Sequence, residues 1–213
     1  MRRPSHLPTV EQIERWPAFS PERPLRVLAS GCLTGRACGY DGTSYGDYPV
    51  ARQLLALPNV SLVEFCPEDS SFGTPRALCD IHGGDGFDVL EGRARVKTDA
   101  GADWTDGMVR AGRKMAELGV ASGAHLALLT DISAACGSTN VYDGPRRLRV
   151  YRQGPGVAAA CVLAAGIPVV SQRDFRTLGR ILGKLGRPDL APQDGVDHHE
   201  GDWYRSHFGD TGR

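Results

Sequence analysis

Four short apolar segments, separated by helix-like patterns, limit the folds that this sequence can adopt. The four segments are residues 25–29, 60–65, 124–129 and 167–170. The helix-like patterns that alternate with them are residues 49–57, 105–118, 155–165 and 174–185. Strands that alternate with helices pair in parallel and are covered on both faces. We therefore predict an α/β fold: a mostly parallel, open sheet of about four strands flanked by helices, Rossmann-like, with a small hairpin insertion over residues 87–100.

The composition excludes several classes of protein. The 213 residues carry equal numbers of acidic and basic side chains, so no bulk charge favours nucleic acid. No apolar run approaches the roughly 20 residues that a membrane span needs, and residues 1–24 lack the apolar core of a signal peptide. We predict a cytoplasmic protein with an N-terminal extension (1–24), a single α/β domain (25–185) and a C-terminal tail (186–213). The sequence leaves the oligomeric state open.

Three of the six cysteines follow the apolar segments. Cys32 and Cys66 lie just past the first two segments, and Cys136 lies in the loop after the third. Because the carboxyl ends of parallel strands share one edge of a sheet, these thiols are expected to meet there. Soft thiolates select zinc, copper(I) or iron–sulfur clusters. The spacings of 34 and 70 residues, without a CxxC pair, favour a cluster in a pocket over a structural zinc site. Alternatively, each cysteine is a small buried hydrophobe, the common fate of a single free thiol.

The same cysteines belong to motifs that resemble a known family. The first motif is Ser30-Gly-Cys32-Leu-Thr-Gly-Arg-Ala-Cys38-Gly-Tyr-Asp41-Gly42. The others follow in the order Cys66-Pro-Glu68, Thr74-Pro-Arg76, Gly101-Ala-Asp-Trp-Thr105, Ser133-Ala-Ala-Cys136-Gly-Ser138, Tyr142-Asp-Gly144 and Gly154-Pro-Gly-Val157. Together they resemble the bacterial 2-thiouracil desulfidases and their domain-of-unknown-function relatives over residues 25–172. The chain departs from that family at Ala134 and Ala135, where Pro and Ser are usual, and at Gly39, where arginine is usual.

The resemblance implies a 4Fe-4S cluster held by three cysteines, with one iron left open. Matching the motifs assigns the ligands to Cys32, Cys66 and Cys136, with Cys38 as a reserve ligand. Cys161 lies in an apolar helix pattern and is expected in the core. The implied function is that of an iron–sulfur-dependent desulfidase. Such a hydrolase would convert a small thiolated pyrimidine base or nucleotide, such as thiouracil, to its oxygen form and release sulfide.

Five polar residues are candidates for the chemistry. Glu68 is two residues from an implied ligand and is the candidate general base, and Ser133 would donate a hydrogen bond or relay the proton. The alternatives are a carboxylate bonded to loop amides and a turn serine. Arg76, Ser138 and Asp41 are the candidate substrate-binding residues. Arg76 could equally pair with a loop carboxylate, and Asp41 precedes a glycine, as in an ordinary turn.

Two further features carry weaker hypotheses. Gly154-Pro-Gly156 opens a helix pattern, and helix N-termini suit anions. The tail contains His198-His-Glu200 and His207, which could bind a metal, although adjacent histidines in a polar tail are more typical of a solvated surface. Trp203 and Tyr204 are expected to anchor this tail on the core.

Two other functions remain open on the sequence alone. One is a non-catalytic sensor module in which the cysteines hold a metal or a cluster. The other is a cluster-dependent sulfur transferase that passes sulfur to an acceptor other than water.

Overall fold

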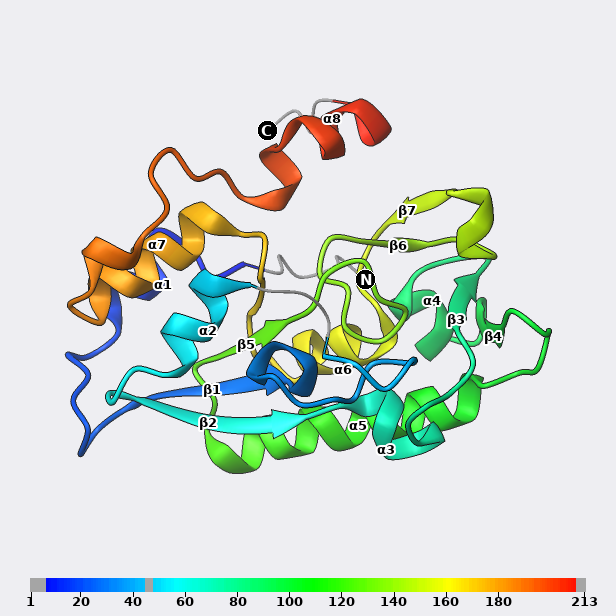
Figure 1. The fold of residues 1–213 in the computed structure, drawn as a ribbon, viewed down its shortest axis with the longest axis horizontal. Coiled ribbons are helices and arrows are strands. Elements are labelled where there is room, and N and C mark those ends of the chain that lie inside the picture. The colour runs from blue at the N-terminus through cyan, green and yellow to red at the C-terminus, as the bar shows by residue number, and fades with distance from the viewer. Residues whose placement is uncertain (1–6, 45–47, 210–213) are drawn as a thin grey trace.

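The computed structural model describes residues 7–44 and 48–209, arranged around a sheet of four parallel strands (Figure 1). The strands are β1 (Leu25–Ser30), β2 (Val60–Phe65), β5 (Leu126–Leu129) and β8 (Val169–Ser171). Their order in the sheet is β2-β1-β5-β8. Leu25 lies opposite Val60 in the first pair, and Ala127 lies opposite Val169 in the last. The predicted α/β fold with four parallel strands is confirmed.

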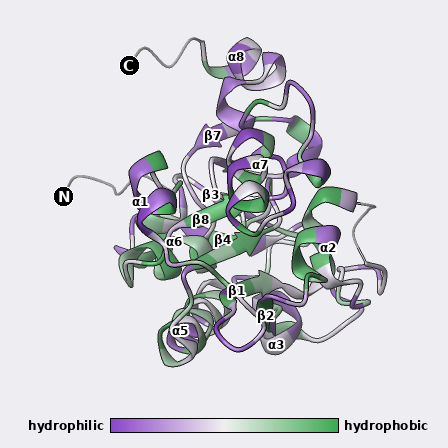
Figure 2. Cartoon of the chain, turned by 90° about the vertical axis from the view of Figure 1, so that its left-hand side faces the viewer, coloured by the Kyte–Doolittle hydropathy of each residue, from purple (hydrophilic) through white to green (hydrophobic). Residues whose placement is uncertain are grey.

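Alternating side chains of the strands face two different helix layers. Val27 and Ala29 pack with α2 (Pro49–Leu55) and α7 (Phe175–Lys184), and α1 (Val10–Arg15) joins the same layer. Leu28 packs on the opposite face with α5 (Thr105–Ser122) and α6 (Val157–Ala164). Figure 2 shows the hydrophobic strands between α5 on one side and α7 on the other. Both faces of the sheet are therefore covered, which leaves its edges and strand ends for function.

Helix α5 differs from its prediction at both ends. It passes through Gly119, the predicted stop, and ends at Gly123, which has a left-handed backbone with φ of 60°. Gly119 is a packing residue instead, because a Cβ there would lie 2.7 Å from Ile167 Cδ1. Thr105 was the predicted N-cap but is the first helical residue, and its hydroxyl accepts the Val96 N–H at 2.9 Å.

The small hairpin exists, but its strands are not the two halves of residues 87–100. The first half forms the helix α4 (Gly86–Leu90), because Asp85 caps it and accepts the Asp88 N–H at 3.1 Å. The second half contains β4 (Arg95–Thr98), which pairs antiparallel with β3 (Cys79–His82), a segment predicted as loop.

A second antiparallel pair was not predicted. It consists of β6 (Asn140–Tyr142) and β7 (Tyr151–Gln153), joined through the short helix η2 (Arg146–Leu148). The other short elements are η1 (Gly31–Thr34), α3 (Pro67–Phe72), η3 (Pro188–Leu190), η4 (His198–Glu200) and α8 (Asp202–Phe208). In Figure 1, α8 lies above the β6–β7 pair.

The tail packs as its aromatic residues predicted. Tyr204 is buried, and the Trp203 ring meets the edge of Tyr151 with centroids 5.0 Å apart. His198 is also buried, contrary to the expectation of a solvated surface. Residues 1–6, 45–47 and 210–213 of the predicted extension, loop and tail lie outside the described residues. The division into extension, domain and tail stays a prediction. No helix in the described part of the chain is long and apolar enough to span a bilayer.

Candidate active site

The topology of the sheet creates a crevice between β1 and β5. The chain leaves β1 toward β2 on one side and later continues from β5 to β8 on the other. Ligands of open α/β sheets bind at such a switch point, beyond the carboxyl ends of the strands. A cavity of about 280 Å³ lies there. The predicted site residues that line it are Cys32, Cys66, Glu68, Arg76, Ser133 and Cys136.

The side chain of Cys32 makes a contact between the ends of the two central strands, β1 and β5. It lies in η1, directly after β1, and its Sγ is 2.8 Å from the Oγ1 of Thr130, which follows β5. Burial raises the pKa of the Cys32 thiol to about 11, although the Thr130 hydroxyl opposes the shift. The free thiol is therefore neutral near pH 7.

Cys66 is the N-cap residue of the short helix α3. Its Sγ accepts the Asp69 N–H at 3.4 Å and lies 3.7 Å from the Cys38 carbonyl oxygen. Pro67 at the first helical position suits a helix start. The Cys38 thiol hydrogen-bonds the Cys66 sulfur, which lowers the pKa of Cys66 and raises that of Cys38. Cys38, the reserve ligand, is thus adjacent to Cys66 and also lines the cavity.

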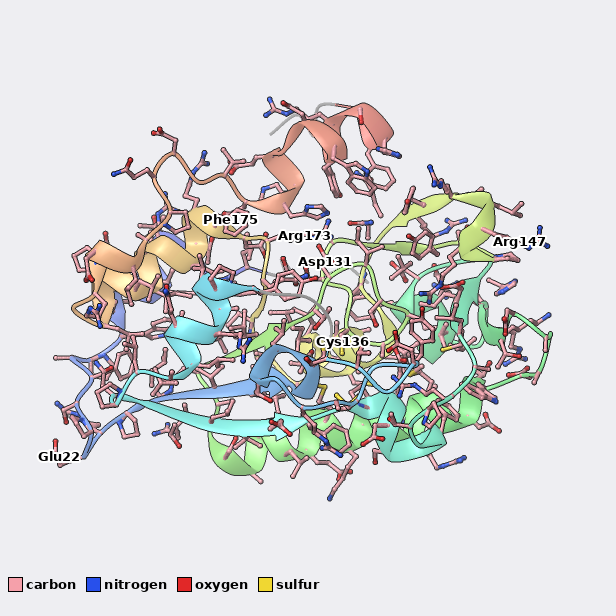
Figure 3. The ribbon with its side chains drawn as sticks, viewed as in Figure 1. Glu22, Asp131, Cys136, Arg147, Arg173 and Phe175 are labelled. Atoms are coloured by element: carbon pink, nitrogen blue, oxygen red, sulfur yellow. The ribbon has the colours of Figure 1, made fainter. Side chains whose placement is uncertain are left out.

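The loop that carries Cys136 is held by hydrogen bonds of its own. The Ser133 Oγ accepts the N–H groups of Ala135 at 3.2 Å and of Cys136 at 3.1 Å. Cys136 is buried, and burial raises the pKa of its thiol well above the ordinary range. Figure 3 shows Cys136 in the interior of the molecule, with Asp131 of the same loop nearby.

This loop also docks on the first turn of α6. The Val157 N–H donates to the Ala134 carbonyl at 2.8 Å, and the Ala158 N–H donates to the Ala135 carbonyl at 2.9 Å. The contact requires glycine at position 156, because a Cβ there would lie 2.6 Å from the Ala135 carbonyl oxygen. These helix donors are already bonded, so the anion site expected at the start of this helix is not formed.

Glu68, Arg76 and Ser133 form a connected group across the cavity. Glu68 Oε2 accepts from Arg76 Nη2 at 2.8 Å and Nε at 3.1 Å, and Glu68 Oε1 accepts the Ser133 hydroxyl at 3.3 Å. Arg76 Nη1 donates to the Cys38 carbonyl at 3.0 Å. Burial lowers the pKa of Arg76, but the charge of Glu68, its hydrogen bonds and the nearby Cys66 and Cys79 together outweigh burial, so the pKa is raised. The Arg76 side chain is only 3% exposed, so it supports Glu68 and the Cys38 loop.

Two predicted substrate-binding residues are not among those lining the cavity. Ser138 is buried behind the Cys136 loop, where its N–H donates to Asp131 Oδ1 at 2.9 Å. The Asp41 carboxylate forms a hydrogen bond within its own turn, where its Oδ1 accepts the Thr43 N–H at 3.0 Å. Their role in binding stays a prediction. Cys161 packs in the core, as predicted.

Sequence reasoning missed several cavity residues, which are Thr130, Asp131, Cys79, Tyr142, Arg146 and Arg173. Thr130 and Asp131 directly follow a predicted strand, so the rule that placed the cysteines at strand ends would also have found them. Arg146 lies on the unpredicted β6–β7 connection, where its Nη2 pairs with Asp80 Oδ1 at 2.9 Å. Its position depends on strand pairing that no local pattern indicates.

The thiols suit a cluster better than a single ion. Within residues 7–44 and 48–209, no three Cys, His, Asp or Glu side chains converge closely enough for one ion. Each thiolate of a cluster binds a different iron, so cluster ligands lie farther apart than the ligands of one ion. Cys32, Cys66 and Cys136 all line one cavity, so their thiols are available to a group larger than one ion.

Comparison with known proteins identifies the family. A profile of the 2-thiouracil desulfurase family matches residues 27–174. The chain belongs to this family. YbbK, an uncharacterized protein of Bacillus subtilis (strain 168), is 32% identical over 153 residues, which are 71% of this chain and 99% of YbbK.

A solved structure supports the same relationship. The 4Fe-4S-dependent thiouracil desulfidase TudS is 30% identical, with a TM-score of 0.60, over 74% of this chain and 97% of the TudS chain. The family and this structural relative support an enzyme with a desulfidase role. They also support an iron–sulfur cluster in this member of the 2-thiouracil desulfurase family.

Proposed function

We propose that this protein hydrolyses the C=S bond of a small thiolated pyrimidine, base or nucleotide, at a 4Fe-4S cluster. The reaction consumes water, forms the C=O product and releases sulfide. The observation that carries the proposal is the convergence of Cys32, Cys66 and Cys136 on one cavity, beside Glu68 and Ser133. We further propose a cytoplasmic enzyme without a nucleic-acid or membrane partner.

The proposed ligands are Cys32, Cys66 and Cys136. A cluster held by three thiolates would leave one iron free to polarise the substrate C=S bond as a Lewis acid and to accept the sulfur. Cys38 remains a reserve ligand, because its free thiol lies beside that of Cys66 and lines the same cavity. The Thr130 hydroxyl, 2.8 Å from the Cys32 sulfur, stabilises the thiolate form of that ligand.

Glu68 acts as the general base. Arg76 binds one carboxylate oxygen of Glu68 and so keeps the side chain oriented, while the other oxygen faces Ser133 at 3.3 Å. Glu68 Oε1 takes a proton from the attacking water, directly or through the Ser133 hydroxyl. Arg173 also lines the cavity, and its guanidinium would bind a substrate oxygen.

The first test is anaerobic reconstitution with iron and sulfide, followed by assays on thiouracil and on thiolated nucleosides and nucleotides. Cys32→Ala, Cys66→Ala and Cys136→Ala should each lose the brown visible absorption and the activity together. Cys161→Ala is the matched control, because this cysteine is buried in the core, and it should keep both. A colourless wild-type protein with one bound zinc would instead favour a sensor module. Loss of sulfur from the substrate only with an added acceptor, which takes up that sulfur in place of free sulfide, would favour a transferase.

The second test separates the base from the cluster. Glu68→Gln keeps the shape of the side chain and its bond to Arg76, so iron content should be unchanged. Turnover should fall about 100-fold or more, the usual contribution of a general base. Full turnover in this variant would remove Glu68 from the mechanism.

A further inference from the structure

A histidine from the C-terminal tail contacts the polar network behind the Cys136 loop. This tail lies beyond residue 174, where the match to the family profile ends. The His198 Nε2 is 3.1 Å from Asn140 Oδ1 and 3.5 Å from Asp131 Oδ2. His198 is far from Cys136 in sequence, but the two groups that it contacts lie at either end of the loop that carries Cys136.

Asp131 fixes both ends of that loop. Its Oδ1 accepts the N–H groups of Ile132 and Ser138, each at 2.9 Å, and its Oδ2 accepts the Thr139 hydroxyl at 2.9 Å. The Asp131 side chain has no exposed surface. A buried carboxylate is stable only when hydrogen bonds or charges satisfy it. A donor next to Oδ2 therefore contributes to the conformation of the loop as a whole.

The position of the His198 ring is set independently of that loop. Its plane stacks on Trp203, with centroids 5.5 Å apart, and its edge meets Tyr204 at 5.7 Å. Its backbone N–H donates to Asp174 Oδ1 at 3.1 Å. Burial lowers the pKa of His198, more than the nearby charge of Asp131 raises it. The ring is therefore a rigid, neutral N–H donor, anchored on the tail and directed at Asn140 and Asp131.

We propose that His198 is a positioning residue, which holds the Cys136 loop in its cluster-binding conformation through Asn140 and Asp131. The inference rests on the proposed function for the role of Cys136, but it makes a separate claim about the protein without metal. The tail would then complete the active site by supplying a hydrogen-bond donor from outside the region that matches the family profile.

The test measures how fast Cys136 is alkylated in folded, metal-free protein, read by mass spectrometry of its peptide. His198→Phe keeps a ring against Trp203 but removes the N–H, so alkylation of Cys136 should rise about tenfold through local opening of the loop. Alkylation of Cys161, which is also buried, should not change. His198→Gln restores an N–H donor near the position of Nε2 and should return the rate to within about twofold of wild type.

His125 gives a matched control. It precedes the opposite end of β5, where its Nδ1 accepts the Arg26 N–H at 3.0 Å, and it also packs against aromatic rings. His125→Phe should leave the alkylation of Cys136 unchanged. If His198→Phe does not fold, His198→Asn takes its place, because its amide is too short to reach and should also expose Cys136.

Three outcomes would overturn the inference. They are unchanged alkylation in both His198→Phe and His198→Asn, equal alkylation in His198→Gln and His198→Phe, or a rise in His125→Phe as large as in His198→Phe. After reconstitution, His198→Phe should bind less iron than His198→Gln. Because alkylation is measured without metal, a wild type inactive on every thiolated pyrimidine would refute the proposed function and leave the alkylation result standing.

Discussion

Replacing Gly156 by alanine tests whether the contact between α6 and the Cys136 loop builds the site. Gly156 has an ordinary backbone, with φ of −69°, so alanine would introduce no conformational strain there. The added Cβ would lie 2.6 Å from the carbonyl oxygens of both Ser133 and Ala135. Because these are backbone atoms, the clash is relieved only if the loop moves away from the helix.

The cost follows from the contacts that such a movement weakens. Overpacking of a rigid contact costs about 1–3 kcal/mol. The hydrogen bonds from Val157 N–H to Ala134 and from Ala158 N–H to Ala135 would weaken as well, at about 1 kcal/mol each. The free energy of unfolding should therefore fall by about 3–5 kcal/mol, and Tm by roughly 10 °C for a chain of this size. Iron retained after reconstitution should also fall, because the loop carries Cys136.

Gly183→Ala is the matched control. Gly183 is exposed within α7, and a Cβ there would have no atom within 4 Å. Alanine at this position should raise the free energy of unfolding by about 0.5–1 kcal/mol, since it limits the unfolded chain and favours the helix. Circular dichroism melts of the metal-free proteins measure both changes. The reasoning fails if Gly156→Ala melts within about 2 °C of wild type, or if it is destabilised and yet retains as much iron as Gly183→Ala.

Two further predictions concern buried charges. Arg76→Met should lower the free energy of unfolding, measured by chemical denaturation, by about 3–5 kcal/mol, because it leaves Glu68 without its partner. The double variant with Glu68→Gln should regain part of this stability but no activity. An unchanged free energy of unfolding in Arg76→Met would contradict the prediction. Burial raises the pKa of Asp174 to about 7, so the folded protein keeps a proton that the unfolded chain releases above its ordinary pKa of 3.8. The protonated Asp174 therefore contributes up to about 4 kcal/mol to the free energy of unfolding. This contribution is fully present below about pH 4 and is lost as the pH rises through about 7. Asp174→Asn should lack this decline in melts between about pH 5 and about pH 7, and equal pH slopes in the two proteins would refute the assignment.

The strand pattern predicted the sheet because each strand carries its own signal. Residues 60–65 were predicted as a strand and form β2 with the same bounds, since a short apolar run ending before Pro67 can form little else. Such a run followed by a cysteine also places that cysteine at the edge of the sheet. The sequence alone was therefore enough to predict that Cys32 and Cys66 lie at one cavity.

The features that were missed depend on distant partners or on weaker local signals. Residues 79–82 form β3 only because Arg95–Thr98 pairs with them, and neither strand is strongly apolar. The start of α3 was missed although Pro67, Glu68 and Asp69 are typical of a first helical turn. The burial of His198 was missed because its polar partners Asn140 and Asp131 are distant in sequence, and its two neighbours in the tail are polar.

Hydrogen bonds from Ser133, Asp131 and the first turn of α6 hold the Cys136 loop in place, and all of them are made within the polypeptide. Small zinc domains differ, since they unfold once their metal leaves. If the proposed cluster were lost from this protein, these hydrogen bonds would keep the Cys136 loop folded. Reloading would then need iron and sulfide but no refolding of the loop.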